Sequence, residues 1–208
     1  MPQASSFAKV EISPNVASRV LRGESAAIAQ AYEVMAQAVM NLAYRMLNDR
    51  QMAEEVLQDT FIDLLEKYSQ IKSPGAISPW VRTVAVNHCL MKLRSPWHAR
   101  RSAQDADAVF EQHPDMHVQQ DSSVSTQDLE SALGVLNPDS RAVLWLHDVE
   151  GYTHKEIGHL MGKTASFSKS QLARAYGKLM GWRSNPAATN VKKNIENDDE
   201  NRRSKGTC

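Results

Sequence analysis

Apolar residues in this chain recur at intervals of three and four, a spacing that fits α-helices. From Ser25 to Leu47 they follow a single helical face. The same spacing returns in later segments, at about 51–68, 78–94, 128–136, 138–150, 154–161 and 164–179. No segment alternates apolar and polar residues with the period of two that is typical of strands. The sequence therefore predicts an all-α fold.

Capping residues indicate where several of these helices begin and end. Asn137 followed by Pro138 is a cap and a first-turn residue, and predicts a helix start. Thr153 and Glu156 have the spacing of a capping box, in which each side chain satisfies a free backbone amide of the new helix. Gly162 should end that helix, because glycine readily adopts the left-handed conformation of a C-terminal cap.

Two patterned regions are separated by a stretch without any period. Residues 102–127 are rich in Asp, Gln, Ser and His, a composition typical of a linker. We therefore predict two small helical domains, for which 208 residues leave room. The expected organisation is a loose N-terminal extension at 1–24, a helical domain at 25–98, a flexible acidic linker at 99–127, a domain containing a helix-turn-helix at 128–183, and a disordered charged tail at 184–208.

Charge is sorted along the chain although its sum is zero, with 24 Lys and Arg against 24 Asp and Glu. The charged residues of 49–66 are acids apart from Arg50. Those of 82–101 are all basic. Residues 152–183 are again basic, with Glu156 as their acid. A run of charge is often only a solvated face, but successive runs that match successive elements favour separate acidic and basic surfaces.

The segment from Thr153 to Leu179 has the order of a helix-turn-helix, with a short capped helix, a polar turn and a second helix. The second helix should expose hydroxyl, amide and basic side chains opposite its apolar face. Such side chains can pair with phosphates and with base edges in the major groove. An ordinary helical hairpin with a polar outer face has the same pattern, so this pattern alone leaves both interpretations open.

Both halves of the chain resemble the extracytoplasmic-function sigma factors, the smallest members of the main bacterial sigma family. Residues 53–61, AEEVLQDTF, are similar to the family's AEDLVQETF, and WVRTVAVN at 80–87 is similar to WLxxIAxN. Residues 136–162, LNPDSRAVLWLHDVEGYTHKEIGHLMG, resemble LPxxxRxVLxLxxxEGxSxxEIAxxLG, and SKSQLARA at 168–175 resembles VKSRLxRA. Phe167 and Gln171 depart from the pattern, so no relative's promoter preference can be carried over to this chain.

The resemblance implies a non-enzymatic protein that binds core RNA polymerase, recognises promoter −35 and −10 elements, and assists promoter melting. Its implied partners are core polymerase, duplex and melted promoter DNA, and an anti-sigma protein. The implied polymerase-docking residues are Glu54, Glu55, Gln58, Asp59 and Asp63. The implied −10 contacts are Ser73, Pro74, Gly75, Trp80, Arg82, Asn87, Lys92 and Arg94. The implied −35 contacts are Lys163, Thr164, Ser166, Phe167, Lys169, Ser170, Gln171, Arg174 and Lys178.

Two further questions concern Trp80 and the start of its helix. Trp80 fits core packing between helices at least as well as stacking on an extruded base. Ser78 and Pro79 have the composition of a helix start, with serine as the cap and proline in the first turn.

Other functions fit parts of the sequence less well. A stand-alone helix-turn-helix regulator would bind DNA by itself, usually as a dimer, but the acidic residues at 51–68 do not suit a dimer seam. A protein that only sequesters sigma factors would not need the basic second helix. An enzyme would need a phosphate-binding glycine loop, a metal cluster or a nucleophile with its base. Cys89, Cys208 and the scattered histidines form none of these, so we expect no catalytic residue, cofactor or metal.

The first residues lack the basic region and apolar core of a secretory signal. No stretch approaches the roughly 18 apolar residues of a membrane-spanning helix. We therefore expect no membrane insertion and a cytoplasmic location.

Overall fold

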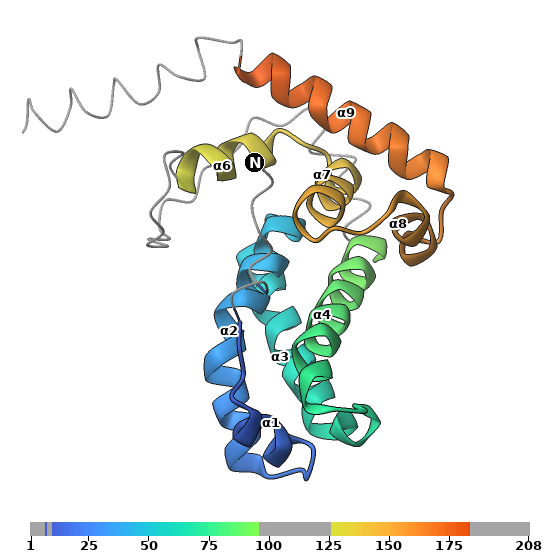
Figure 1. The fold of residues 1–208 in the computed structure, drawn as a ribbon. Coiled ribbons are helices and arrows are strands. Elements are labelled where there is room, and N and C mark those ends of the chain that lie inside the picture. The colour runs from blue at the N-terminus through green and yellow to red at the C-terminus, as the bar shows by residue number, and fades with distance from the viewer. Residues whose placement is uncertain (1–6, 8–9, 96–125, 184–208) are drawn as a thin grey trace, which may run out of the picture.

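The computed structural model describes residue 7, residues 10–95 and residues 126–183 (Figure 1). All regular elements in these ranges are helices, which confirms the predicted all-α fold. Most of the expected linker and the whole expected tail lie outside the described residues. The elements are α1 (Pro14–Val20), α2 (Ser25–Leu47), α3 (Arg50–Lys67), η2 (Tyr68–Gln70), η3 (Pro74–Ala76), α4 (Ile77–Arg94), α6 (Thr126–Gly134), α7 (Pro138–Leu144), η4 (Trp145–Val149), α8 (His154–Met161) and α9 (Ala165–Arg183).

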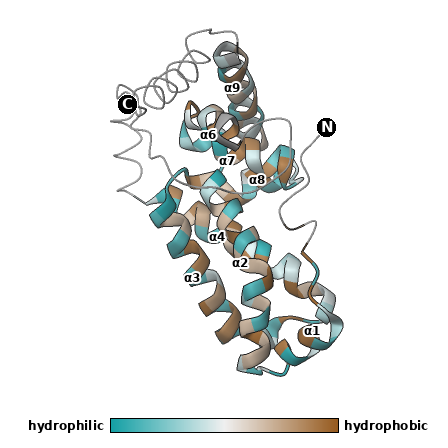
Figure 2. Cartoon of the chain, turned by 90° about the vertical axis from the view of Figure 1, so that its left-hand side faces the viewer, coloured by the Kyte–Doolittle hydropathy of each residue, from teal (hydrophilic) through white to brown (hydrophobic). Residues whose placement is uncertain are grey.

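Helices α2, α3 and α4 lie side by side and form the first packing unit (Figure 1). Met35 and Leu42 of α2, Leu64 of α3 and Leu90 of α4 are buried between them. Each helix carries both hydrophobic and hydrophilic residues (Figure 2). The hydrophobic ones recur every three or four positions, so each helix has an apolar face to bury. Burial of these faces is the main stabilising contribution in this unit.

The expected loose N-terminal extension contains a helix, so the sequence prediction was wrong for residues 14–20. Residues 14–20 form α1, and the side chain of Ser13 accepts a hydrogen bond from the Val16 amide at 3.4 Å. Ala17 and Val20 are buried, and α1 packs against α2. A helix of seven residues is too short to show a clear hydrophobic period, which is why the pattern missed it.

The second packing unit consists of α7, η4, α8 and α9, and its predicted caps are confirmed. Asn137 Oδ1 accepts from the Ser140 amide at 2.8 Å, with a proline at the start of α7. Thr153 and Glu156 form both hydrogen bonds of the capping box at the start of α8. Gly162 ends α8 in the left-handed conformation.

The backbone at the start of α9 lies close against Gly158 of α8. A Cβ atom at this position would lie 2.8 Å from the carbonyl carbon of Thr164 and 2.9 Å from the amide nitrogen of Ala165. A larger residue would therefore push the start of α9 away from α8. Ile157 and Leu172 are buried on either side of this contact. The absence of a side chain at Gly158 sets the spacing of the helix-turn-helix.

One buried arginine joins the two units. The Arg141 guanidinium on α7 donates to the carbonyls of Met46 and Leu47, at 3.2 and 3.1 Å, at the end of α2. It also contacts the carbonyls of Leu133 and Leu136 at 3.5 and 3.4 Å. The last carbonyls of a helix lack intrahelical donors and carry the negative end of its dipole, so a cation is favourable there. Burial lowers the pKa of Arg141 to about 10, which leaves it charged at neutral pH.

Candidate nucleic-acid interface

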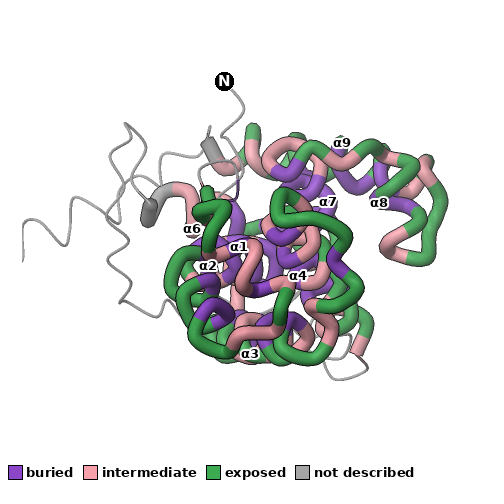
Figure 3. Tube along the Cα trace, turned by 60° about the horizontal axis from the view of Figure 1, so that its bottom comes forward, coloured by how far each residue is buried: buried purple, intermediate pink, exposed green. Residues whose placement is uncertain are grey.

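Helix α9 has a face that is exposed to solvent (Figure 3), and the residues on it are mostly polar or basic. Thr164 begins the helix, since its hydroxyl accepts from the Phe167 amide at 3.1 Å. Residues 165–183 contain no acid. The structure therefore brings hydroxyl and cationic side chains together on one exposed surface, as the sequence predicted for a recognition helix. The exposed members of the predicted set are Lys163, Thr164, Ser166, Lys169, Ser170, Arg174 and Lys178.

Gln171 is not part of this surface, contrary to the sequence prediction. Its side chain is 6% exposed, and its amide oxygen accepts a hydrogen bond from the Ser140 hydroxyl at 2.7 Å. The side chain thus joins α9 to α7 inside the unit, and its amide cannot at the same time reach a base edge. Phe167 is half-buried, and the Lys163 ammonium lies 5.9 Å from the centre of its ring.

A cluster of polar and aromatic side chains contacts α9. His147 and His154 stack with ring centres 4.4 Å apart, and His154 Nδ1 lies 3.0 Å from the buried Ser168 hydroxyl of α9. The Tyr176 hydroxyl donates to Asp148 at 2.8 Å. Burial lowers the pKa of His154, and the neighbouring His147 and the cation of Lys169 lower it further. A largely neutral imidazole therefore holds α9 against the rest of the unit at neutral pH.

The acidic side chains of α3 lie on the predicted face, but most of them have partners. Glu54 pairs with Arg50 at 2.9 Å within α3. Glu55 pairs with Lys92 of α4 at 2.6 Å, and the same ammonium lies 3.9 Å from Asp59. Gln58 is exposed on the same face. The row of acids is therefore balanced in part by cations from its own helix and from α4.

Asp63 is the most enclosed of these acids. It forms an ion pair with Lys67, and its other oxygen lies within hydrogen-bond distance of His88 Nε2, at 3.0 Å. Burial by itself would raise the pKa of Asp63, but the hydrogen bonds from Lys67 and His88 outweigh it, and the pKa lies below its usual range. Asp63 therefore stays ionised and links α3 to α4 in addition to any contact that it makes outside the chain.

The predicted −10 residues divide into a loop and a helix face. Ser73, Pro74 and Gly75 are exposed at the loop tip, whereas Trp80 is half-buried against the core. The helix begins earlier than predicted, because α4 starts at Ile77 and no side chain caps it. Its remaining predicted contacts are the exposed Asn87, the exposed Arg94, and the half-buried Arg82 and Lys92.

Arg82 is engaged by the second unit. Its Nη2 atom donates to the backbone carbonyl of Glu150 at 3.0 Å, and its Nε atom lies 3.5 Å from the Glu150 carboxylate. The guanidinium also lies 5.0 Å from the centre of the Tyr152 ring. The Glu150 side chain is fully buried in this arrangement. A cation predicted to contact DNA is thus held by the opposite unit.

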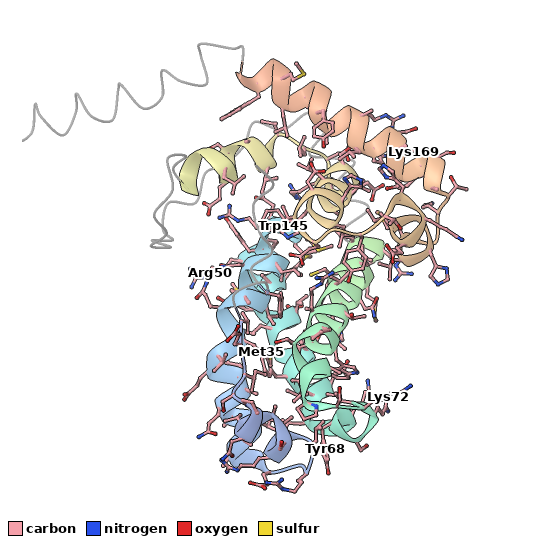
Figure 4. All side chains as sticks on the ribbon, viewed as in Figure 1. Met35, Arg50, Tyr68, Lys72, Trp145 and Lys169 are labelled. Carbon is pink, nitrogen blue, oxygen red and sulfur yellow. The ribbon has the colours of Figure 1, made fainter. Side chains whose placement is uncertain are left out.

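The sequence analysis missed Lys72, an exposed cation immediately before the loop tip (Figure 4). Its position next to Ser73 in the sequence was the available signal. It also missed the contact between Arg82 and Glu150, because these residues are 68 positions apart and no local pattern relates them. No group of side chains in the described ranges could hold a metal ion. Among the same residues, no helix has the length and apolar character to cross a membrane.

A three-helix unit joined to a helix-turn-helix unit with a basic outer helix defines a two-domain, helical DNA-binding protein. Comparison with known proteins identifies the class. The family model for sigma-70 region 2 matches residues 31–99, and the model for sigma-70 region 4 matches residues 126–179. The chain belongs to the extracytoplasmic-function sigma factors of the sigma-70 family, which are non-enzymatic proteins of transcription initiation.

Its relatives include the ECF RNA polymerase sigma factor SigE of Mycolicibacterium smegmatis, 30% identical over 146 residues. That match covers 69% of this chain and 56% of SigE, so the chain spans little more than half of that relative. RNA polymerase sigma factor CarQ of Myxococcus xanthus is 31% identical over 147 residues, 69% of this chain and 82% of CarQ. The sigma factor RpoE of Bartonella quintana, solved with the anti-sigma factor NepR, has a similar fold, with a TM-score of 0.53, 24% identity, and coverage of 74% of this chain and 94% of RpoE.

Proposed function

We propose that this protein binds core RNA polymerase, directs it to promoters through −35 and −10 elements, and assists promoter melting. The observation that carries the proposal is the order of a region 2 match and a region 4 match in one chain, with an exposed basic face on α9 of the second. The domain organisation that we propose keeps the two domains at 25–98 and 128–183.

In this proposal α9 reads the −35 element in duplex DNA. Lys169 and Arg174 neutralise phosphates or pair with guanine edges, and Ser170 adapts to either acceptor or donor. Lys163 and Lys178 stand at the two ends of the exposed face and contact the backbone. Gln171 is left out of the contact set because it is buried on Ser140. Binding of this kind weakens steeply as salt rises, since each phosphate contact releases a counterion.

Helix α3 is the proposed docking surface for core polymerase. A face of one sign accelerates encounter with a basic partner and disfavours wrong partners more than it adds affinity. Glu54 and Gln58 are exposed and offer the most accessible contacts, and Glu55, Asp59 and Asp63 complete the row. The contacts of Lys92 and His88 with this row hold it in place, and the Lys92 ammonium reduces its net charge.

The loop at 68–76 and the exposed face of α4 are proposed to hold the melted −10 element. A base that leaves the stack needs backbone hydrogen bonds and an apolar wall, which Ser73, Pro74 and Gly75 can supply. Asn87 and Arg94 are exposed along α4 for the phosphates, and Lys72 adds a cation next to the loop tip. Trp80 is half-buried, which favours a packing role for most of its ring.

The contacts of Arg82 and Arg141 between the two units affect which residues are free to bind DNA. The Arg82 guanidinium is held by Glu150 and Tyr152 in this arrangement, which leaves it only partly available to a phosphate. The −35 and −10 elements are named for their positions upstream of the start site, which differ by about 25 base pairs. At about 3.4 Å per base pair this separation is roughly 85 Å of duplex. In contrast, Arg141 holds the second unit directly against the end of α2. We therefore propose that the two units separate when polymerase and promoter bind.

We extend two further features to this protein as part of the proposal. Its place of action is the cytoplasm, where polymerase and chromosome are located. Its partner in the inactive state is an anti-sigma protein, by analogy with the Bartonella quintana sigma factor solved with NepR.

The proposal is tested by transcription in vitro from a genomic promoter library with purified core polymerase. Discrete new start sites are expected only when the protein is added, and a Lys169→Ala, Arg174→Ala double variant should lose them. Lys155→Ala removes an exposed lysine of α8 outside the proposed contacts and serves as the control. If no start site depends on the protein, and it retards duplex DNA without polymerase, the stand-alone regulator is the correct interpretation.

A further inference from the structure

We propose that the N-terminal segment, residue 7 and residues 10–24, positions the −10 loop, the residues 68–76 that connect α3 to α4. This inference rests on the proposed function of that loop in holding an extruded base. It assigns a role to residues that precede the region 2 match, which begins at residue 31.

The first contact joins Gly23 to the start of the loop. Gly23 lies between α1 and α2 with a φ of +74°, a backbone conformation that favours glycine. The ring of Tyr68 packs directly on this glycine, and a Cβ atom at residue 23 would overlap the ring. Figure 4 labels Tyr68 at the lower end of the long helices, where α1 and the loop meet. Gly23 therefore leaves room for the Tyr68 ring, and this contact joins the N-terminal segment to the first residue of the loop.

The other contacts join the same segment to the middle of the loop and to the start of α4. Helix α1 packs against η3, the turn that contains Pro74 and Gly75. Directly after the loop, in the first turn of α4, the Ser78 hydroxyl lies 3.5 Å from the carbonyl of Val10. Phe7 and Val10 belong to the apolar core or pack against it, and so anchor this part of the segment.

The loop has few internal means to hold its shape. Residues 72–75 are exposed, and only Ile71 and Ile77 on either side are buried. Its own backbone hydrogen bonds are short-range, from the Ile71 amide to the Tyr68 carbonyl and from the Ala76 amide to the Ser73 carbonyl. Capture of an extruded base requires that the capturing groups be held in position before the base arrives. The N-terminal segment supplies this constraint through its contacts with Tyr68, with η3 and with Ser78.

The experiment uses polymerase holoenzyme and single-stranded oligonucleotides that carry the non-template −10 sequence of a promoter found by the transcription experiment. Each base is replaced in turn by an abasic site, and the affinity ratio between the intact and the abasic oligonucleotide measures base capture. For the captured position we expect a ratio of about tenfold in the wild type, the scale of one stacked base. Gly23→Ala should bring this ratio close to one without changing affinity for the abasic oligonucleotide.

Two more variants keep the test decisive. Ser78→Ala removes the hydroxyl near Val10 with little risk to folding, and should lower the ratio by a smaller factor. Gly181→Ala is the matched control, because a Cβ atom there meets no other atom within 4 Å. A merely structural role would reduce holoenzyme formation or binding of all oligonucleotides alike, not the ratio.

The outcomes separate the two proposals. If the wild type shows a base-specific ratio and both Gly23→Ala and Ser78→Ala keep it, the N-terminal segment has no positioning role and the proposed function stands. If the wild-type protein forms no holoenzyme that binds these oligonucleotides, the proposed function itself is wrong.

Discussion

The two units of this protein are stabilised in different ways. In the unit of α2, α3 and α4, the buried residues are apolar except for Thr60, whose hydroxyl bonds to a carbonyl of its own helix at 2.6 Å. In the unit of α7, α8 and α9, polar and charged side chains enter the interior beside fewer apolar ones. These buried polar residues are Ser140, Arg141, Glu150, Ser168 and Gln171.

The two units differ in their buried residues because they differ in size and in proposed function. A small unit buries little apolar surface, so hydrogen bonds contribute a larger part of its stability. Hydrogen bonds are directional, and those from Ser140 and His154 fix the rotation of α9 about its own axis. A helix that reads base edges needs its outer face held at one rotation. The larger unit can rely on non-directional packing, because its proposed contacts lie on a loop and an acidic helix.

The largest expected effect is a cavity in the apolar unit. Leu42→Ala removes a fully buried side chain from the C-terminal half of α2 and should lower the free energy of unfolding by about 3 to 4 kcal/mol. Urea unfolding combined with hydrogen exchange of each helix measures the loss. Protection should fall in α2, α3 and α4 together. The control Met91→Ala shortens a side chain that is 60% exposed and should cost less than about 1 kcal/mol.

The next effect should reach both units at once. Arg141→Met keeps much of the buried volume but leaves the carbonyls of Met46 and Leu47 without their donor. We expect a loss of about 2 to 3 kcal/mol, with reduced exchange protection in α7 and in the last turn of α2. Arg174→Met, on the exposed face of α9, should leave both regions unchanged. Loss of protection confined to α7 would mean that the two units are independent in solution.

A smaller effect separates two adjacent residues of α9. Gln171→Leu removes the acceptor of the buried Ser140 hydroxyl and should cost about 1 to 2 kcal/mol in unfolding, with an unchanged −35 preference. Ser170→Ala, one position earlier and exposed, should leave stability unchanged and alter the −35 preference. Transcription from promoters with a randomised −35 element, beside urea unfolding, measures both quantities. A changed preference in Gln171→Leu would restore Gln171 to the contact set.

These two residues also show how far the sequence could predict the site. The spacing of 168, 171, 172 and 175 places Gln171 on the buried side of α9, in the same row as Leu172 and Ala175. The sequence analysis nevertheless predicted a base contact for Gln171, because it gave more weight to the polar side chain than to its position in the helix. Helix propensity and capping are local, so Asn137 and Thr153 could be assigned from their neighbours.

Features that depend on distant parts of the chain could not be predicted in the same way. The contact of Arg82 with Glu150 and that of Arg141 with Met46 join segments that are 68 and 95 residues apart. Charge patterning placed basic residues on α4 correctly, but it could not show that one of them is held by the other unit. Likewise, the proposed role of the N-terminal segment depends on contacts with residues far along the chain, as between Val10 and Ser78, which are 68 residues apart.

The smallest expected effect is a pH dependence confined to the polar unit. Unfolded His154 takes up a proton near its ordinary pKa of 6.5, whereas in the folded protein burial, His147 and Lys169 lower that pKa, against a smaller opposite effect of Asp148. Acid therefore favours the unfolded state. The contribution of His154 is fully present above pH 6.5 and is lost as the pH falls through its lower folded pKa.

Hydrogen exchange of α8 and α9 between pH 7.5 and pH 5, corrected for the intrinsic rate, should show this loss of stability, and His154→Gln should remove most of it. The lowered pKa of Asp63 in the apolar unit acts only in a more acidic range, below its ordinary value of 3.8. The same holds for Glu156 in the capping box, whose pKa is lowered by its hydrogen bonds to Thr153. The window from pH 5 to 7.5 therefore isolates His154 from both carboxylates. An equal loss of protection in α2 over this window would contradict the assignment of pH sensitivity to the second unit.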